Sequence, residues 1–556
     1  MKEAIDLLIR ESLKFYSISL NLEIPENFDY DLSISKDVSH GDFACNVAFR
    51  LAKVVKQKPS DIASRLAEFL SKNTGSASFS LRKVEVAGGG FINIYLQTQA
   101  LGQIVKDIYV QDQKFGRSEF GKNQKVLIEY VSANPTGPLT IAHGRQAAIG
   151  DCLARILRAA GYLVETEYYL NDGGRQMNLL GKSLLARYKT ELGEPLQLPE
   201  DGYQGIYMAD IAKHLLTEVR SGTQLLKFKD AQTEQDFFRD YAGKFIMKGI
   251  TQDLEDMDVH FDHYFSEQTL YRDKLVDGVF DRLKKSGHFY EQEGALWFSS
   301  TDFGDDKDRV VRKSSGEYTY LAPDIAYHDQ KFQRGFTKLV NLLGPDHHGY
   351  IARLKAACQA LGHNSEALNV LIVQLTTLYR QGQPVRMSTR AGEFVTLREL
   401  MDEVGKDATR YFFVSRKIES HLDFDLDLAK QKSQDNPVFY LQYAHARIAS
   451  LLKFANQGID SNAKVELLTS PEETDLIKKI MEFSNLIIRS SQLLEPHCLA
   501  DYLRELAACF HRFYSVHRIV TEDNDLTKAR LLLANACRIV LRNGLGILGI
   551  SQPESM

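Results

Sequence analysis

"SANPTGPLTIAHGRQAAIGD" (residues 132–151) connects a mainly β-branched and aliphatic run at 126–131 to an amphipathic helix. The helix carries apolar residues at 149, 153, 156, 157 and 160, which share one face, and Gly161 follows as a natural stop. A second strand-like run, YLVETEYYL, occupies 162–170. Strand, loop, helix and strand in this order predict a βαβ unit, which implies a parallel sheet with ligands at the carboxyl ends of its strands.

The loop itself has features of an anion-binding turn. A helix N-terminus presents unpaired N–H groups and the positive end of the helix dipole. Pro135 and Pro138 stiffen the turn, and Gly137 allows a ligand to approach the backbone closely. His143 stands in the first helical turn, where an imidazole can donate to a phosphate oxygen. From this stretch alone, a phosphate-binding loop and a tight structural connector are equally open.

Length and composition predict a folded protein with several domains. The chain has 556 residues, 44% of them hydrophobic and 25% charged, and a formal net charge of −5. Its six scattered cysteines form no CxxC pair, which argues against a zinc ribbon or a disulfide framework. No signal peptide is recognised, and no apolar run reaches the ~20 residues of a membrane span. We therefore expect a cytoplasmic protein with no membrane partner.

The segment before the βαβ unit predicts a separate small domain. Residues 1–115 are expected to form an α+β unit, in which two helices are split at Lys58–Pro59. Two strands alternate around the glycines at 88–90, which suit a turn.

Residues 116–400 predict a Rossmann-type α/β catalytic domain on a parallel sheet. A helical, charged stretch at about 175–290 interrupts the pattern and is expected to be an insertion. Strand-like segments at 337–344 and 367–379 would complete the sheet.

The last part of the chain is expected to be helical almost throughout. Residues 401–430 would form a connecting stem and residues 431–556 an all-α helical bundle. Asp435 or Asn436 before Pro437 marks the start of one bundle helix. On that helix Tyr440, Tyr443 and Arg447 share a face beside the buried stripe.

Three motifs that look like cofactor sites fail on context. GLGILG at 544–549 matches GxGxxG, but no strand precedes it, so a helix end is expected. GRSEFGKN at 116–123 precedes a strand, and Asn123 stands where a phosphate loop needs a magnesium-binding hydroxyl. DHHGY at 346–350 has no second ligand pair at a suitable spacing, so no protein metal site is predicted.

A second candidate element is VRMSTRAGEFVTL at 385–397, which is cationic and rich in small residues. A loop of this kind can close over a triphosphate, and its cations can neutralise charge on departing pyrophosphate. The alternative is an ordinary exposed basic turn.

PLTIAH and RMSTR together resemble the HIGH and KMSKS motifs of class I aminoacyl-tRNA synthetases, about 240 residues apart with an insertion between them. The arginyl-tRNA synthetase family in particular is similar in many segments. In chain order these are HGDFACNVAFRLAK, EYVSANPTGPL, YYLNDGGRQMNLLG, TYLAPDIAYH, LLGPDHHGY, RMSTRAGEFVTL, NPVFYLQYAHAR and NGLGILGISQPESM. The resemblance covers essentially the whole chain, in family order.

The resemblance implies a reaction in two steps. Members of the family form arginyl-adenylate from L-arginine and ATP, with Mg²⁺ carried on the ATP phosphates. They then pass arginine to the 3′-terminal adenosine of tRNA(Arg), and activation is expected to need bound tRNA. The implied catalytic residues are Thr140, His143, Arg386, Ser388 and Arg390. The implied ATP contacts are Asn134, Pro135, Thr136, Gly137, Pro138, Leu139, Ile141, Ala142, Gly144, Gly344, Asp346, His347, Met387 and Thr389.

The same resemblance implies an arginine site. A guanidinium is a planar fork of donors that matches carboxylates, and Glu129 and Asp324 match the acidic residues of the family. Tyr320 would cover the arginine side chain, while Ser132 and Asn134 would hold the rest of the substrate.

For tRNA, the helical C-terminal part resembles an anticodon-binding domain, and the N-terminal part would contact the outer corner of the tRNA. Tyr440, Tyr443 and Arg447 suit stacking on unpaired bases, although packing on a neighbouring helix is an alternative. A monomer is expected.

Two departures from the family pattern matter. Thr140 and Ala142 stand at the first histidine and the glycine of HIGH, and the KMSKS lysines are replaced by Arg386 and Thr389. A lysine upstream of HIGH would then support ATP, and Lys122 and Lys125 are both candidates. Two other functions are weighed: a non-catalytic RNA-binding or regulatory paralogue, and another nucleotidyltransferase with the same βαβ core.

Overall fold

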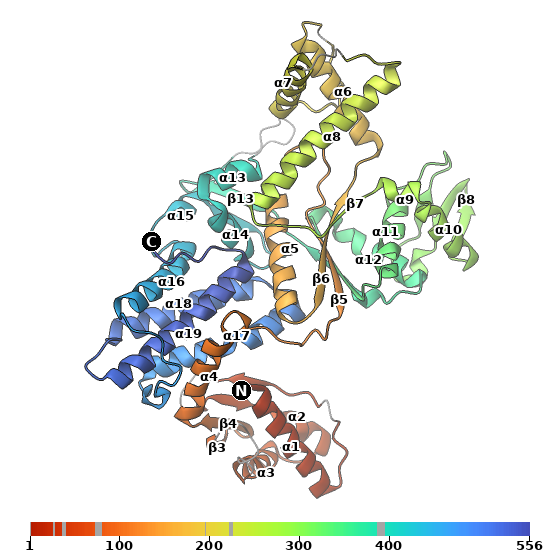
Figure 1. Cartoon of the computed structure of the whole chain (residues 1–556). Helices are drawn as coiled ribbons and strands as arrows, with labels where there is room; N and C mark the ends of the chain where they lie inside the picture. The colour runs from red at the N-terminus through yellow and green to blue at the C-terminus, as the bar shows by residue number, and fades with distance from the viewer. Residues whose placement is uncertain are drawn as a thin grey trace.

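The structure is a computed structural model, shown in Figure 1. It describes residues 2–25, 28–35, 40–72, 81–194, 196–221, 226–385 and 395–556.

An antiparallel sheet with helices forms the N-terminal domain, as predicted. The strand order is β1-β2-β4-β3, and β3 and β4 pair around the glycine turn. The elements are α1 (Lys2–Leu20), β1 (Leu32–Ile34), β2 (Phe43–Cys45), α2 (Val47–Val55), α3 (Pro59–Lys72), β3 (Leu81–Ala87), β4 (Phe91–Leu96) and α4 (Thr98–Gln111).

A five-stranded parallel sheet forms the centre of the molecule. Its order is β12-β11-β5-β6-β7, and each neighbouring pair is parallel. The elements are β5 (Lys125–Glu129), α5 (Ile141–Ala159), β6 (Leu163–Leu170), β7 (His263–Ser266), β11 (Lys338–Leu343) and β12 (Leu368–Ile372). The predicted βαβ unit is β5–α5–β6. Because the strands are parallel, the loops after β5, β6, β7 and β11 gather at one edge.

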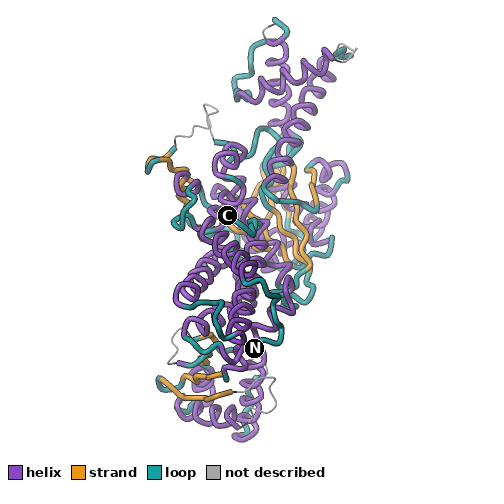
Figure 2. The backbone as a smooth tube through the Cα atoms, turned by 60° about the vertical axis from the view of Figure 1, so that its left-hand side comes forward, coloured by secondary structure: helices purple, strands orange, loops and turns teal. Residues whose placement is uncertain are grey.

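Two insertions lie between β6 and β11. Helices α6 (Gly174–Glu191), α7 (Ile206–Ser221) and α8 (Ala231–Asp256) form an arm that projects from the sheet (Figures 1 and 2). A smaller unit follows, made of α9 (Gln268–Arg272), α10 (Leu275–Lys285), β8 (Phe289–Gln292), β9 (Ala295–Phe298), β10 (Arg309–Arg312) and α11 (Leu321–Gln333).

The prediction of one insertion at 175–290 needs correction, because β7 lies inside that range and pairs with β6. The strand is four residues long and partly exposed, so it leaves no clear apolar pattern in the sequence.

The chain then passes through a stem into the helical C-terminal bundle. Helix α12 (Ile351–Ala360) connects β11 to β12 within the catalytic domain. The stem region that follows contains β13 (Thr376–Arg380), β14 (Gln383–Pro384), α13 (Leu397–Val404), α14 (Lys406–Val414), β15 (Leu422–Asp425) and α15 (Leu426–Lys430). Strand β13 leaves the main sheet and pairs with β14 and β15, so the predicted strand at 367–379 is two strands in different sheets.

The bundle consists of α16 (Pro437–Phe454), α17 (Pro471–Leu493), α18 (His497–Val516) and α19 (Asn524–Leu548). Asn436 caps α16, and its side chain accepts from the Val438 N–H. GLGILG ends α19, and Gly549 has a φ of +69°. Among the described residues, α19 is the one helix long and apolar enough to cross a membrane. Because 72% of its apolar window is buried inside the bundle, α19 is a core helix.

A buried ion cluster joins α5 to the stem and the bundle. The fully buried Arg410 of α14 pairs with Asp151 of α5 and donates to the Leu548 and Met257 carbonyls, at 2.8 and 2.9 Å. Arg155 of α5 binds Asp151 and Asp258, at 2.8 and 3.0 Å. The helix that follows the predicted phosphate loop is therefore held against the C-terminal bundle.

Candidate active site

The loop after β5 leaves the strand in a strained conformation. Val131 and Ser132 have φ values of +68° and +41°, a region that costs non-glycine residues about 1–3 kcal/mol each. In this conformation the Ser132 hydroxyl donates to Glu129 (3.1 Å) and accepts from the Tyr169 N–H (3.1 Å). Two predicted substrate residues, Glu129 and Ser132, are thereby brought together at the carboxyl end of the sheet.

Thr140 caps the N-terminus of α5, and His143 lies in its first turn. The Thr140 N–H donates to Nδ1 of His143 at 3.2 Å. Burial lowers the pKa of His143 to about 4, so the ring is neutral at pH 7. Since Nδ1 accepts a hydrogen bond, the ring proton is on Nε2, which is therefore a donor for an anion at the helix end.

The HIGH-like turn contacts the end of the second motif. The Leu397 N–H donates to the Leu139 carbonyl at 2.8 Å, and Thr140 and Thr396 form a β-bridge. Gly144 permits this approach, because a Cβ there would lie 2.6 Å from a Leu397 methyl carbon. The predicted residues Arg386, Met387, Ser388, Thr389 and Arg390 lie outside the described residues. The described chain on their C-terminal side, at Thr396 and Leu397, nevertheless lies beside the predicted phosphate loop.

Asp324 lies in the first turn of α11 and accepts a hydrogen bond from the Tyr350 hydroxyl at 2.6 Å. Burial raises the pKa of Asp324 to about 7, and the negative charges of Glu129 and Glu267 add to the shift. This carboxyl is thus poised between its neutral and charged forms near pH 7. A cation brought to it would favour the charged form.

Glu267 is a further acid near Asp324 that sequence reasoning missed. It directly follows β7 and accepts from the Tyr169 hydroxyl at 2.9 Å. Burial raises its pKa. The sequence gives little indication of Glu267, because β7, the strand just before it, is short, partly exposed and without a clear apolar pattern.

A buried lysine partly offsets the acids. Lys331 is fully buried, donates to Glu129 at 2.5 Å and to Asn341 at 3.3 Å, and lies 4.1 Å from the Tyr327 ring centroid. Glu129, Asp324 and Glu267 all lie around Tyr169, and Lys331 pairs with Glu129 alone among these three acids. The excess of negative charge suits a cationic ligand.

The other predicted contacts lie at the same edge of the sheet. The Asn134 side chain donates to Gln176 of α6 at 2.6 Å, and Tyr320, just before α11, is 83% exposed. Gly344, Asp346 and His347 follow β11, and the last two are exposed. Residues 135–139 form the loop, and Ile141 and Ala142 begin α5.

The predicted role of an upstream lysine, Lys122 or Lys125, does not fit the structure. Lys125 begins β5, whereas the loop follows Glu129 at the other end of the strand. Lys125 and Glu129 are four residues apart along the strand, which corresponds to about 13 Å. Lys122 lies in the turn before the strand. Both lysines are therefore at the edge of the sheet opposite the predicted phosphate loop.

The predicted tRNA face on α16 packs partly against α18. The Tyr440 and Tyr443 ring centroids lie 4.9 and 5.9 Å from that of His511. The Arg447 guanidinium lies 4.1 Å from the Tyr514 centroid and 5.5 Å from that of Tyr443. All three predicted residues are half-buried, so the face is both a packing surface and accessible in part.

Comparison with known proteins agrees with this arrangement. A profile for the catalytic domain of class I (R) tRNA synthetases matches residues 104–421, and one for the arginyl-tRNA synthetase N-terminal domain matches 3–96. The chain belongs to the arginyl-tRNA synthetase family. A profile for the DALR anticodon-binding domain matches residues 441–556. This match argues against the alternative of another nucleotidyltransferase with the same βαβ core.

Full-length relatives support the assignment to the arginyl-tRNA synthetases. An arginine–tRNA ligase of Oceanobacillus iheyensis is 46% identical over 95% of this chain and 94% of its own length. One from Legionella pneumophila (strain Paris) is 44% identical and covers both chains completely. The arginyl-tRNA synthetase of Thermus thermophilus has a TM-score of 0.76 with full coverage at 22% identity, which shows a common fold.

Proposed function

We propose that the chain activates L-arginine with ATP to form arginyl-adenylate and pyrophosphate, and then transfers arginine to the 3′-terminal adenosine of tRNA(Arg). The observation that carries this proposal is the cluster of acids beside a helix N-terminus at one edge of the sheet. A cluster of acids suits the guanidinium, and a helix N-terminus suits the phosphates.

In this proposal the arginine side chain lies between Asp324, Glu267 and Glu129. Because the guanidinium is always charged, its arrival draws Asp324 into the carboxylate form. Asn134 and Ser132 hold the polar end of the substrate. Tyr320, exposed beside α11, covers the side chain.

On the ATP side, the Thr140 hydroxyl and Nε2 of His143 donate to phosphate oxygens. A carboxylate oxygen of arginine attacks the α-phosphorus, and the bond from that phosphorus to the pyrophosphate oxygen breaks. No nucleophilic side chain is required, so catalysis rests on positioning and charge stabilisation. Arg386, Ser388 and Arg390 stabilise the departing pyrophosphate, and Mg²⁺ enters with ATP on its phosphate oxygens.

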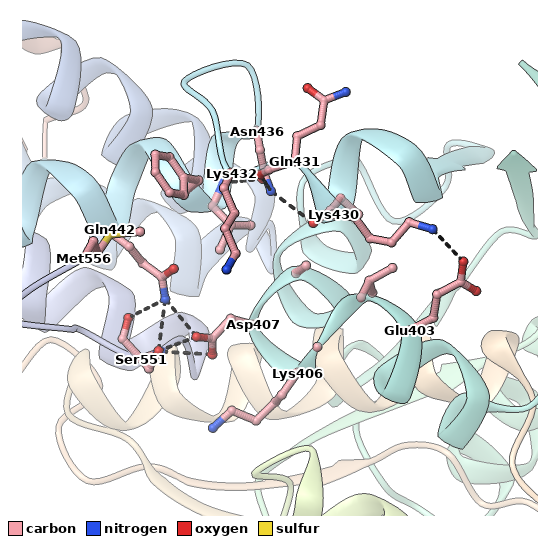
Figure 3. Close-up of a pocket in the computed structure, with 16 residues that line it drawn as sticks. Glu403, Lys406, Asp407, Lys430, Gln431, Lys432, Asn436, Gln442, Ser551 and Met556 are labelled. Carbon is pink, nitrogen blue, oxygen red and sulfur yellow. Dashed lines mark hydrogen bonds and ion pairs between the residues drawn. The ribbon is translucent and has the colours of Figure 1, made fainter. Parts of the chain in front are cut away.

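For tRNA, the aromatic face of α16 is proposed to stack on unpaired anticodon bases. Phe439 extends this face, since its ring stacks with Tyr443 at 6.0 Å and 9°. Phe439 also lines a cavity of about 710 Å³ at the junction of stem and bundle, together with Lys406 and Lys432 (Figure 3). An aromatic ring beside lysines suits a base and its phosphate.

We further propose that the protein is a cytoplasmic monomer and that its N-terminal domain contacts the outer corner of the tRNA.

Arginine-dependent exchange between ATP and labelled pyrophosphate, with and without tRNA, tests the proposal. Exchange is expected with arginine and only when cognate tRNA is present. No exchange with cognate tRNA would favour a non-catalytic paralogue, and exchange with another amino acid would refute the arginine specificity.

A further inference from the structure

The inserted arm contacts both signature segments of the site. Helix α6 reaches the loop through Gln176, which accepts from Asn134. Helix α8 reaches the C-terminal side of the second motif, where Arg398 of α13 binds Asp253 and Asp256, at 2.8 and 2.5 Å. The arm is therefore attached to the elements that are proposed to hold the substrates.

A third attachment is made by the start of α7. The Tyr207 hydroxyl donates to the Thr136 carbonyl at 2.8 Å, and a Cβ at Gly137 would lie 3.4 Å from the same hydroxyl oxygen. The Thr136 side chain also hydrogen-bonds to Tyr203. Tyr203 and Tyr207 are both half-buried, so these bonds are partly shielded from water.

The geometry of the peptide group gives this contact a consequence for ATP. In a planar trans peptide the carbonyl and the following N–H point in opposite directions. Fixing the Thr136 carbonyl therefore fixes the direction of the Gly137 N–H. Pro135 and Pro138 have no N–H, and the Thr136 N–H already donates to Asn134, so the loop has few amides left for a phosphate.

We propose that Tyr207 is a positioning residue for the ATP step. Its hydroxyl holds the Thr136–Gly137 peptide so that the Gly137 N–H faces the nucleotide. Since Tyr207 belongs to the arm, the position of the arm sets the geometry of the phosphate loop. This inference rests on the proposed function and adds a residue, outside both signature motifs, that acts through the loop.

Tyr207→Phe tests the proposal, because it removes one hydroxyl and keeps the ring that packs on Gly137. In the pyrophosphate exchange assay we expect the KM for ATP to rise about three- to tenfold, as for loss of one hydrogen bond. The KM for arginine should stay unchanged. Partial unfolding would lower the amount of active enzyme but would leave both KM values unchanged.

Tyr241→Phe is the matched control. Its hydroxyl donates to Glu218 within the arm, at 2.8 Å, and touches no residue of the loop. We expect its KM for ATP to equal that of the wild type.

Gln176→Ala gives an independent check on the other attachment. Because Gln176 contacts Asn134, which is proposed to hold the polar end of arginine, its loss should raise the KM for arginine. An unchanged KM for ATP in Tyr207→Phe, beside an active wild type, would overturn the inference. Absence of exchange in the wild type would instead refute the proposed function.

Discussion

Two ion clusters, each built on a buried charge, lie on the β5–α5 unit, one along α5 and one at the carboxyl end of β5, and they differ in charge balance. At the junction with the bundle, Arg410 and Arg155 meet Asp151 and Asp258, and Arg410 also donates to backbone carbonyls. At the carboxyl end of β5, Lys331 pairs with Glu129, while Asp324 and Glu267 add further negative charge.

The difference separates a structural cluster from a binding cluster. Buried ions are stable when their charges and hydrogen bonds are matched, and the junction meets this condition. At β5, burial raises the pKa of Asp324 to about 7, and the charges of Glu129 and Glu267 add to this shift, so the charged form of Asp324 destabilises the protein without ligand. A bound cationic ligand offsets this destabilisation, because its charge pairs with the Asp324 carboxylate. Mutations at the junction should therefore lower stability and spare arginine binding. Mutations at the carboxyl end of β5 should weaken arginine binding and spare stability.

The largest effect is expected for Arg410→Met at the junction. Removing this fully buried cation leaves Asp151 short of a partner, which should lower the free energy of unfolding by about 3–5 kcal/mol. Urea denaturation measures the change, while the KM for arginine should be unaltered. Arg175→Met is the control: its pair with Asp201 is exposed, so a loss below about 1 kcal/mol is expected. Equal losses in the two variants would contradict the structural role.

Asp324→Asn should have the converse result. We expect kcat/KM for arginine to fall about 30- to 1,000-fold, because the guanidinium loses a buried charged partner. Stability should not fall, since a repulsive acid is removed. Pyrophosphate exchange and urea denaturation measure the two quantities.

Asp329→Asn, on the same helix, is the matched control for Asp324→Asn. Asp329 is buried and pairs with Arg282 and His363, so its loss should lower stability and spare the KM for arginine. If Asp329→Asn and Asp324→Asn changed stability and arginine kinetics in the same way, the proposal that Asp324 belongs to a binding cluster would be wrong.

Glu267→Gln should give a smaller loss in the same direction. The amide keeps the size of the side chain but removes one charge, so kcat/KM for arginine should fall about ten- to fiftyfold. Glu165→Gln is the control: Glu165 lies on β6 and pairs with His263 rather than with the acid cluster, so its loss should leave this value unchanged. A wild-type value for Glu267→Gln would remove Glu267 from the proposed pocket.

The smallest expected effect is that of pH. With a pKa of about 7, Asp324 is mostly neutral at pH 6 and mostly charged at pH 8, so kcat/KM for arginine should rise about tenfold between them. Because folding raises this pKa above its usual value, the wild type should lose stability relative to Asp324→Asn as pH rises from about 4 to about 7. A pH profile that Asp324→Asn does not flatten would assign the titration to another group.

Much of the local architecture was predictable from sequence patterns. The β5–α5–β6 unit, the β3–β4 pair and the start of α16 follow from apolar periodicity, glycine turns and caps, which depend on neighbouring residues. The motif resemblance correctly identified the family. Glu129 and Asp324, predicted from that resemblance, do lie in one electrostatic network.

Other features could not be obtained this way. Strand β7 is short and half-exposed, and its place beside β6 is set by pairing across almost a hundred residues of chain. Lys125 is close to the loop in sequence, yet the length of β5 carries it to the far edge of the sheet. Nearness in sequence was therefore a poor guide wherever a strand intervened.

The sequence by itself determined the fold class, the family and the main candidate residues, because periodicity and motif chemistry are encoded locally. The tertiary structure alone decided the partners of those residues. It paired Lys331 with Glu129 across 202 positions, placed Glu267 near Asp324, and brought Tyr207 to the Thr136 carbonyl. The physical reason is that pKa values, ion pairing and loop geometry depend on distances in space, which the path of the whole chain sets.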